Sequence, residues 1–184
     1  MVASFWSRLV LPLVVLAVAG AAAWGVALRL VDPLSTDVIP AEDPYTHLAL
    51  TREHLRDGSI DGLNGPETPY PPGLHAVLAT FAVHSGVALD DIVRFGPVAF
   101  GAIAVVGTAL ALRRLDGNAA AVVGALVVAV TPELVFRSQM MAPTAMDLAI
   151  LPFALLGLTL TVRGRLGWAA PTAMLLGFLL VSHP

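Results

Sequence analysis

Apolar residues are grouped along this chain into long uncharged runs. The first run covers 9–28, which is twenty residues between Arg8 and Arg29. A helix of about that length crosses the roughly 30 Å hydrocarbon layer of a bilayer. Four further runs follow, each able to extend a little into its flanking residues. Together the runs predict membrane spans over about 9–30, 93–113, 117–134, 146–162 and 166–184.

The first run has one alternative interpretation, a cleaved signal peptide. Ala21, Ala22 and Ala23 resemble the small residues of a cleavage site. A core of twenty residues is long for a signal peptide, however, so the pattern favours a spanning helix.

The uncharged segment 68–89 differs from the other runs. It opens with Thr68-Pro69-Tyr70-Pro71-Pro72-Gly73, where the prolines oppose a helix, and its helical part, 73–86, is short. Short cytoplasmic loops favour arginine. If this segment stays outside the membrane, three groups of arginines fall on one side, namely Arg8, the pair Arg113 and Arg114, and the pair Arg163 and Arg165. We therefore predict a multi-pass protein of the cell membrane with five spans, a cytoplasmic amino terminus and a long external loop over 31–92.

Composition agrees with this interpretation. Hydrophobic residues make up 57% of the 184 residues and charged residues only 12%, about half the share in soluble domains. The formal charge of −3 provides no basic field for nucleic acid. All ten bases are arginine, which excludes Schiff-base lysine chemistry, and the absence of cysteine excludes disulfides and thiolate metal sites.

The predicted external loop contains ten of the thirteen acidic residues, so we expect function to reside there. Its segment Glu42-Asp43-Pro44-Tyr45-Thr46-His47 is typical of a helix start, with Asp43 as the cap and a helix that ends near Gly58. At 100° per residue, Asp43, His47 and His54 share one face of that helix, with Glu42 adjacent. Carboxylates there suit Mg²⁺ or Mn²⁺. The alternative is that Asp43 only caps the helix and the histidines face water.

Two other groups of residues carry candidate chemistry. His75 and His84 are nine residues apart, which makes a poor metal pair, so we expect them to be interfacial or packing residues. In the second external turn, 131–147, Arg137 can bind a phosphate in a bidentate manner and stabilise its charge when it leaves. The alternatives are a snorkelling arginine and an ion pair between Arg137 and Asp147.

Three motifs, taken in order, resemble a known family. They are Glu42-Asp43-Pro44-Tyr45-Thr46-His47, Tyr70-Pro71-Pro72-Gly73-Leu74, and the segment from Pro132 to Arg137-Ser138. Together they resemble the catalytic subunit of oligosaccharyltransferase, especially its archaeal forms, and more broadly the GT-C glycosyltransferases. The resemblance implies an all-α, polytopic transmembrane bundle that transfers a sugar or oligosaccharide from a polyprenyl or dolichyl phosphate-linked donor to a protein, lipid or glycan acceptor.

The resemblance also implies roles for individual residues. Asp43 becomes a metal ligand or the general base, and Glu42 belongs to the same catalytic group. Arg137, Tyr45 and His47 become substrate-binding residues, and Asp147 becomes a second ligand for a divalent metal, Mg²⁺ or Mn²⁺.

This chain departs from the family pattern in two respects. The family has acids seven and nine residues after the equivalent of Arg137, where this chain has Thr144 and Met146, and Asp147 comes one residue later. This difference favours a branch without the second metal motif. Family members are also much longer, so we expect an amino-terminal part of a GT-C domain. The rival hypothesis is a non-catalytic, multi-spanning protein, a transporter-like or assembly subunit whose acidic loop binds a partner or cations.

Overall fold

The computed structural model describes residues 2–36, 39, 43–57 and 73–182, with side chains from residue 10 onward except at 43 and 57. This part of the chain is entirely helical apart from its connections, which confirms the all-α prediction. Its helices are α1 (Val2–Ser35), α2 (Asp43–Asp57), α3 (Gly73–Ser85), α4 (Leu89–Asp116), α5 (Asn118–Val130), α6 (Pro132–Arg137), α7 (Pro143–Val162), the 3-10 turn η1 (Leu166–Trp168) and α8 (Ala169–Ser182).

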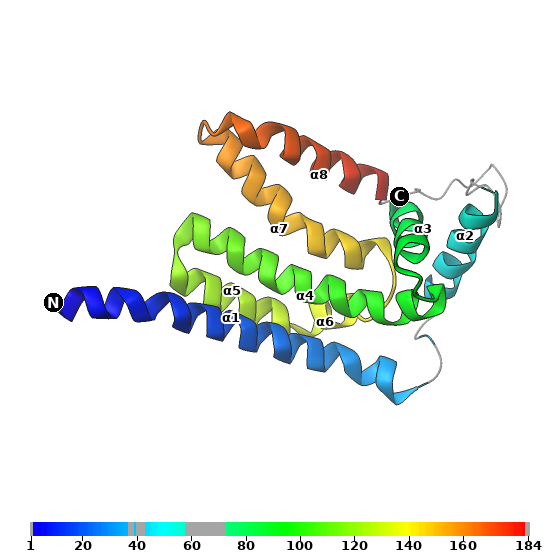
Figure 1. Cartoon of the computed structure of the whole chain (residues 1–184), viewed down its shortest axis with the longest axis horizontal. Coiled ribbons are helices and arrows are strands. Elements are labelled where there is room, and N and C mark those ends of the chain that lie inside the picture. The colour runs from blue at the N-terminus through cyan, green and yellow to red at the C-terminus, as the bar shows by residue number, and fades with distance from the viewer. Residues whose placement is uncertain (1, 37–38, 40–42, 58–72, 183–184) are drawn as a thin grey trace.

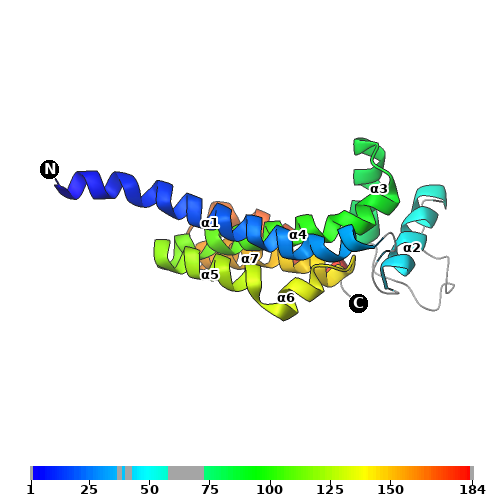
Figure 2. The ribbon, with the colours of Figure 1, turned by 90° about the horizontal axis from the view of Figure 1, so that it is seen from below.

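The longer helices form an antiparallel bundle. In Figure 1, α1, α4, α5, α7 and α8 lie lengthwise, and each runs opposite to the one before it along the chain. α4 is central, with α1 and α5 packed on one side and α7 on the other, while α8 packs on α7. α2 and α3 lie at the end of the bundle where α1 ends and α4 begins, whereas α6 lies farther back, against α1 and α5 (Figures 1 and 2). We call this end of the bundle the α2/α3 end.

Small residues allow α1, α4 and α5 to approach closely. On α5, Ala121, Ala125 and Ala129 are spaced four apart, so they share one helix face, and all three are at most 1% exposed. Without large side chains between them, helices in a membrane gain van der Waals contact along their backbones. The residues packed with this alanine face are Ala21 and Gly25 of α1 and Val105 and Ala109 of α4.

A larger apolar cluster fixes α2 and α3 to the bundle. The cluster joins Leu48 of α2 and Leu74 of α3 to the start of α4 and to the first turn of α7 with the residues just before it. Its buried members are Ile39, Leu48, Leu74, Leu78, Ile92, Val93, Met141 and Met146. Gly73 begins α3 against the last turn of α8, where a Cβ atom would come within 2.9 Å of the Val181 carbonyl oxygen. α2 and α3 are thus held to the bundle by buried side chains and by a close backbone contact.

Three helical segments are long and apolar enough to cross a membrane, namely Val10–Ser35, Leu89–Asp116 and Pro143–Val162. The segments Asn118–Val130 and Leu166–Ser182 are apolar but shorter, and so is α3. The structure therefore agrees with a membrane protein that has at least these candidate spans among the residues it describes. Five spans remain a prediction.

The predicted span over 117–134 is divided into two helices. Thr131 has an extended backbone, with φ −62° and ψ 119°, because the following Pro132 disfavours the α conformation at the residue before it. α5 therefore ends at Val130, and Pro132 starts α6 at its first position, where the missing N–H does no harm. In the predicted span over 166–184, the first residues form the 3-10 turn η1, which continues directly into α8.

The alanine face of α5 makes a testable prediction. Ala125→Leu should lower the unfolding free energy by about 1–3 kcal/mol, because Ala125 is fully buried against α1 and α4 and a larger side chain there forces the helices apart. Val123→Leu on the same helix is the matched control, since Val123 is 60% exposed. Thermal unfolding in detergent measures both, and equal melting temperatures for the two variants would contradict the close packing.

Candidate functional site

Arg29 is a buried cation near the carboxyl-terminal end of α1, with only 1% of its surface exposed. Its Nε donates to Ser138 Oγ at 2.6 Å, and Nη1 donates to the carbonyl oxygens of Gly25 at 2.9 Å and Ala129 at 3.3 Å. Nη2 donates to the carbonyl oxygen of Val128 at 3.2 Å. All four acceptors are neutral, and the guanidinium group has five N–H donors.

The Arg29 charge has no counter-ion among the described residues, because no carboxylate there pairs with it. Burying a charge away from water is costly unless it is paired. An ionisable residue inside a candidate span therefore indicates a functional site by default. The local structure satisfies the guanidinium with hydrogen bonds but leaves its charge uncompensated.

Two glycines make room for Arg29. A Cβ atom on Gly101 of α4 would overlap the Nε and Cδ atoms of Arg29, and one on Gly25 would come within 3.0 Å of Nη1. Gly101 thus lets the arginine side chain lie directly against α4. The position of the guanidinium depends on helices that are far apart in sequence.

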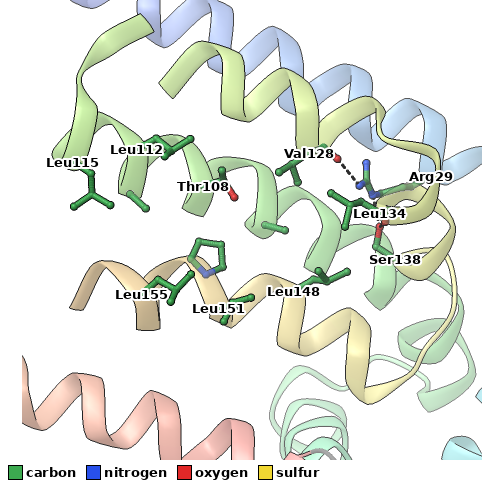
Figure 3. Close-up of a pocket in the computed structure, with 13 residues that line it drawn as sticks. Arg29, Thr108, Leu112, Leu115, Val128, Leu134, Ser138, Leu148, Leu151 and Leu155 are labelled. Atoms are coloured by element: carbon green, nitrogen blue, oxygen red, sulfur yellow. Dashed lines mark hydrogen bonds between the residues drawn. The ribbon is translucent and has the colours of Figure 1, made fainter. Parts of the chain in front are cut away.

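An apolar cleft of about 250 Å³ leads from Arg29 along the bundle. Figure 3 shows Arg29 and Ser138 at one end of the cleft and Leu115 at the other. The walls come from α4, α5, α6 and α7, and leucines predominate among the residues that line them: Leu112, Leu115, Leu134, Leu148, Leu151 and Leu155. The cleft therefore combines a cation and a hydroxyl at one end with an apolar interior.

A pair of buried histidines connects α2 to α3. His47 Nδ1 lies 3.1 Å from His75 Nε2, and their side chains are almost completely buried. A hydrogen bond between two rings needs one donor and one acceptor nitrogen, so at least one of the two rings is neutral. One turn further along α2, Thr51 Oγ1 donates a hydrogen bond to the His47 carbonyl oxygen at 2.7 Å.

The histidine predictions have mixed outcomes. His47 does not face water, which corrects that alternative, because it is 1% exposed and meets His75 of α3. His54 is half-buried, and its Nδ1 has no hydrogen-bond partner in the part of the chain that the structure describes. His75 is a packing residue as predicted, but it packs against another histidine, whereas His84 is exposed and lies 2.8 Å from the Thr80 carbonyl oxygen.

Asp147 and Arg137 are separate in the structure. Ser182 Oγ donates to Asp147 Oδ1 at 2.8 Å, which links α7 to the last turn of α8 beside Gly73. Arg137 Nε donates to Glu133 Oε1 at 2.7 Å on the exposed surface of α6. The ion pair between Arg137 and Asp147 that the sequence allowed is therefore not formed. An exposed pair such as Arg137 with Glu133 contributes little to stability.

The predicted catalytic acids lie largely outside what the structure describes. Glu42 is not among the described residues, and of Asp43 only the backbone is described, where it starts α2 as predicted. Tyr45, two residues later, is 45% exposed. Among the described side chains, no three of the His, Asp and Glu type come together as a metal site. The predicted metal site around Asp43 falls outside that search.

Sequence reasoning missed Arg29 and Ser138. In the sequence, Arg29 only marks where the first apolar run stops, and Ser138 only follows Arg137. The signal was available for Arg29, because an arginine within reach of a spanning helix must find polar partners. Nothing in the sequence identified Ser138 or the α5 carbonyl groups as those partners.

Comparison with known proteins adds no relative. The chain matches no family model, and no curated protein shows significant similarity to it. The site must therefore be interpreted from its own chemistry.

Gly101 provides a direct test of how Arg29 is held. Gly101→Ala should destabilise the protein by about 1–3 kcal/mol, because the added methyl group overlaps the arginine side chain. Gly177→Ala in α8 is the matched control, because no atom lies within 4 Å of its added methyl group and alanine favours a helix over glycine. The measurement is thermal unfolding of both variants in detergent. A Gly101→Ala protein as stable as Gly177→Ala would show that Arg29 does not occupy this position.

Proposed function

We propose that this protein is a membrane glycosyltransferase. It transfers a sugar or oligosaccharide from a polyprenyl or dolichyl phosphate-linked donor to a protein, lipid or glycan acceptor at the outer face of the membrane. The observation that carries the proposal is the cleft that ends at Arg29 and Ser138. A lipid-linked donor joins an apolar chain to a phosphate, and the cleft offers leucines to the chain and a buried cation to the phosphate.

Arg29 fits the chemistry of the leaving group. Negative charge grows on the phosphate oxygen as the sugar departs, and a cation already held in a low-dielectric site stabilises that charge without having to reorganise. Ser138 supplies a hydroxyl at the same place. Arg137, the adjacent residue in the chain, is a second cation for the phosphate at the exposed side of α6.

The acceptor side of the proposal rests on the motif at the start of α2. Asp43, with Glu42 beside it, takes the proton from the acceptor or binds a divalent metal such as Mg²⁺ or Mn²⁺. Asp147 is the second carboxylate for that metal, and Tyr45 and His47 bind substrate. Support comes from the Asp147–Ser182 contact, which lies beside Gly73 at the α2/α3 end, and Arg29 lies farther along the bundle, against Gly101 of α4.

The proposal includes the orientation in the cell membrane. α1, α4, α5 with α6, α7 and α8 are the five spans, and the α2/α3 end is external. Support comes from the arginine pairs, since Arg113 and Arg114 end α4 and Arg163 and Arg165 follow α7, both at the opposite end of the bundle. Cytoplasmic loops favour such residues. This orientation makes the amino terminus cytoplasmic.

A second candidate function is a non-catalytic, transporter-like membrane protein. Arg29 favours this candidate as well, because a buried ionisable residue in a spanning helix also marks translocation paths. Vesicles distinguish the two functions. Transfer of a labelled sugar from a polyprenyl phosphate donor supports the enzyme, whereas solute uptake without any transfer supports the transporter.

Asp43 tests the catalytic assignment. In the full-length protein reconstituted in vesicles, Asp43→Asn should abolish sugar transfer while membrane insertion stays intact, because the amide neither accepts the proton nor neutralises a metal. Asp32→Asn, an exposed aspartate at the end of α1, is the control and should retain activity. Product mass and vesicle flotation give the two measurements, and unchanged transfer in Asp43→Asn would remove Asp43 from the mechanism.

Arg29 tests the donor assignment. Arg29→Gln should weaken donor binding by about ten- to a hundredfold, measured as KM for the lipid-linked sugar, because a charge-assisted hydrogen bond to phosphate is lost. Arg29→Lys keeps the charge and should retain part of the affinity, which separates loss of charge from loss of packing. A KM unchanged in Arg29→Gln would assign the phosphate to another cation, with Arg137→Gln as the variant to compare.

A further inference from the structure

A second and larger groove lies on the other side of α4. Its volume is about 750 Å³, with α7 as its floor and α4 and α8 as its walls. α3 contributes only Val77 at one end. Large apolar side chains line most of the groove, among them Phe100, Ile103, Leu110, Phe153, Leu175 and Phe178.

The groove changes character at the end opposite α2 and α3. There it is lined by Arg114 and Arg165, together with Trp168 of η1. Both arginines are exposed, and neither pairs with a carboxylate in the part of the chain that the structure describes. This end of the bundle also has Arg113 and Arg163, whereas Asp116 is its one acid in the described chain, so its electrostatic potential is positive.

The dimensions of the groove suit one lipid chain. From Phe100 to Arg114 along α4 is fourteen residues, which is about 21 Å of helix. That is most of the roughly 30 Å thickness of the hydrocarbon layer. Tryptophan favours the level of the lipid headgroups, so Trp168 and the two arginines mark where the headgroup would lie.

We propose that this groove binds an anionic phospholipid of the surrounding bilayer. One acyl chain lies along α7 between α4 and α8, and the phosphate lies between Arg114 and Arg165. Charge complementarity selects this occupant over a further protein helix, since only an anion satisfies both guanidinium groups at the headgroup level. The proposal requires the helices to lie in a membrane, but it is independent of the proposed glycosyltransferase activity and of the cleft at Arg29.

The experiment uses the fluorescence of Trp168. The other two tryptophans are replaced by phenylalanine, Trp6→Phe and Trp24→Phe, and the full chain is reconstituted in phosphatidylcholine vesicles. In two matched samples, about one lipid in five carries bromine near the carboxyl end of its acyl chain. The brominated lipid is phosphatidylglycerol in one sample and phosphatidylcholine in the other. The quenching of Trp168 fluorescence gives the apparent mole fraction of brominated lipid around this residue. That mole fraction should be about fivefold or more higher for phosphatidylglycerol than for phosphatidylcholine, since each arginine attracts anionic lipid.

A charge-matched pair of variants makes the test specific. Arg114→Gln with Arg165→Gln should remove the preference for phosphatidylglycerol. Arg113→Gln with Arg163→Gln removes the same charge from the same end and should retain the preference, because neither residue lines this groove and Arg113 bonds Asn118 instead. Vesicle flotation checks that each protein is inserted.

Three results would overturn the proposal. They are the absence of any preference in the parent protein, an equal loss of preference in both double variants, and a Trp168 that neither brominated lipid quenches although the protein floats with the vesicles. The second result would show only a general attraction of anionic lipid to this face, and the third would show that protein covers the groove. None of them bears on sugar transfer, so failure of this proposal is distinguishable from failure of the proposed function.

Discussion

The hydrogen bonds of the Arg29 guanidinium are the constraint on which the rest of the bundle depends. One side chain from α1 binds two carbonyl groups at the end of α5 and the hydroxyl of Ser138 just after α6. It can do so only because Gly101 leaves a gap on α4 and the alanines of α5 bring the three helices together. Close packing of small residues thus brings the Arg29 side chain within reach of its hydrogen-bond acceptors on α5.

The break between α5 and α6 belongs to the same arrangement. Pro132 ends α5 one helical turn early and turns α6 away, which places Ser138 beside Arg29. A continuous helix through this region would have carried Ser138 further along the same axis. The result is a cleft whose apolar interior ends at a cation rather than at a bulk aqueous surface. For a ligand with a charged head and a hydrocarbon chain, that geometry matches both parts.

The arginines of the two proposed ligand sites differ in their surroundings. Arg29 is buried and surrounded by neutral acceptors, and the buried His47–His75 pair and the Asp147–Ser182 contact lie at the α2/α3 end. At the other end of the bundle, Arg114 and Arg165 are exposed and line an open groove. A buried cation suits a reacting group that must be desolvated, whereas exposed arginines suit a headgroup that stays hydrated at the membrane surface.

The uncharged runs of the sequence determined the helical class and the approximate extent of the long helices, because these depend on local hydrophobicity. Proline and glycine determined the start of α2 at Asp43 and the start of α3 at Gly73. The GT-C resemblance and the catalytic role of Asp43 remain predictions. Only the tertiary structure decided that His47 meets His75 across 28 residues, that Asp147 bonds Ser182 rather than Arg137, and that Arg29 is a buried cation bonded to Ser138 across 109 residues. The physical reason is that these partners are chosen by which helix faces pack together. That choice is set by small residues and by large apolar side chains on several helices at once, which a single run of sequence does not reveal.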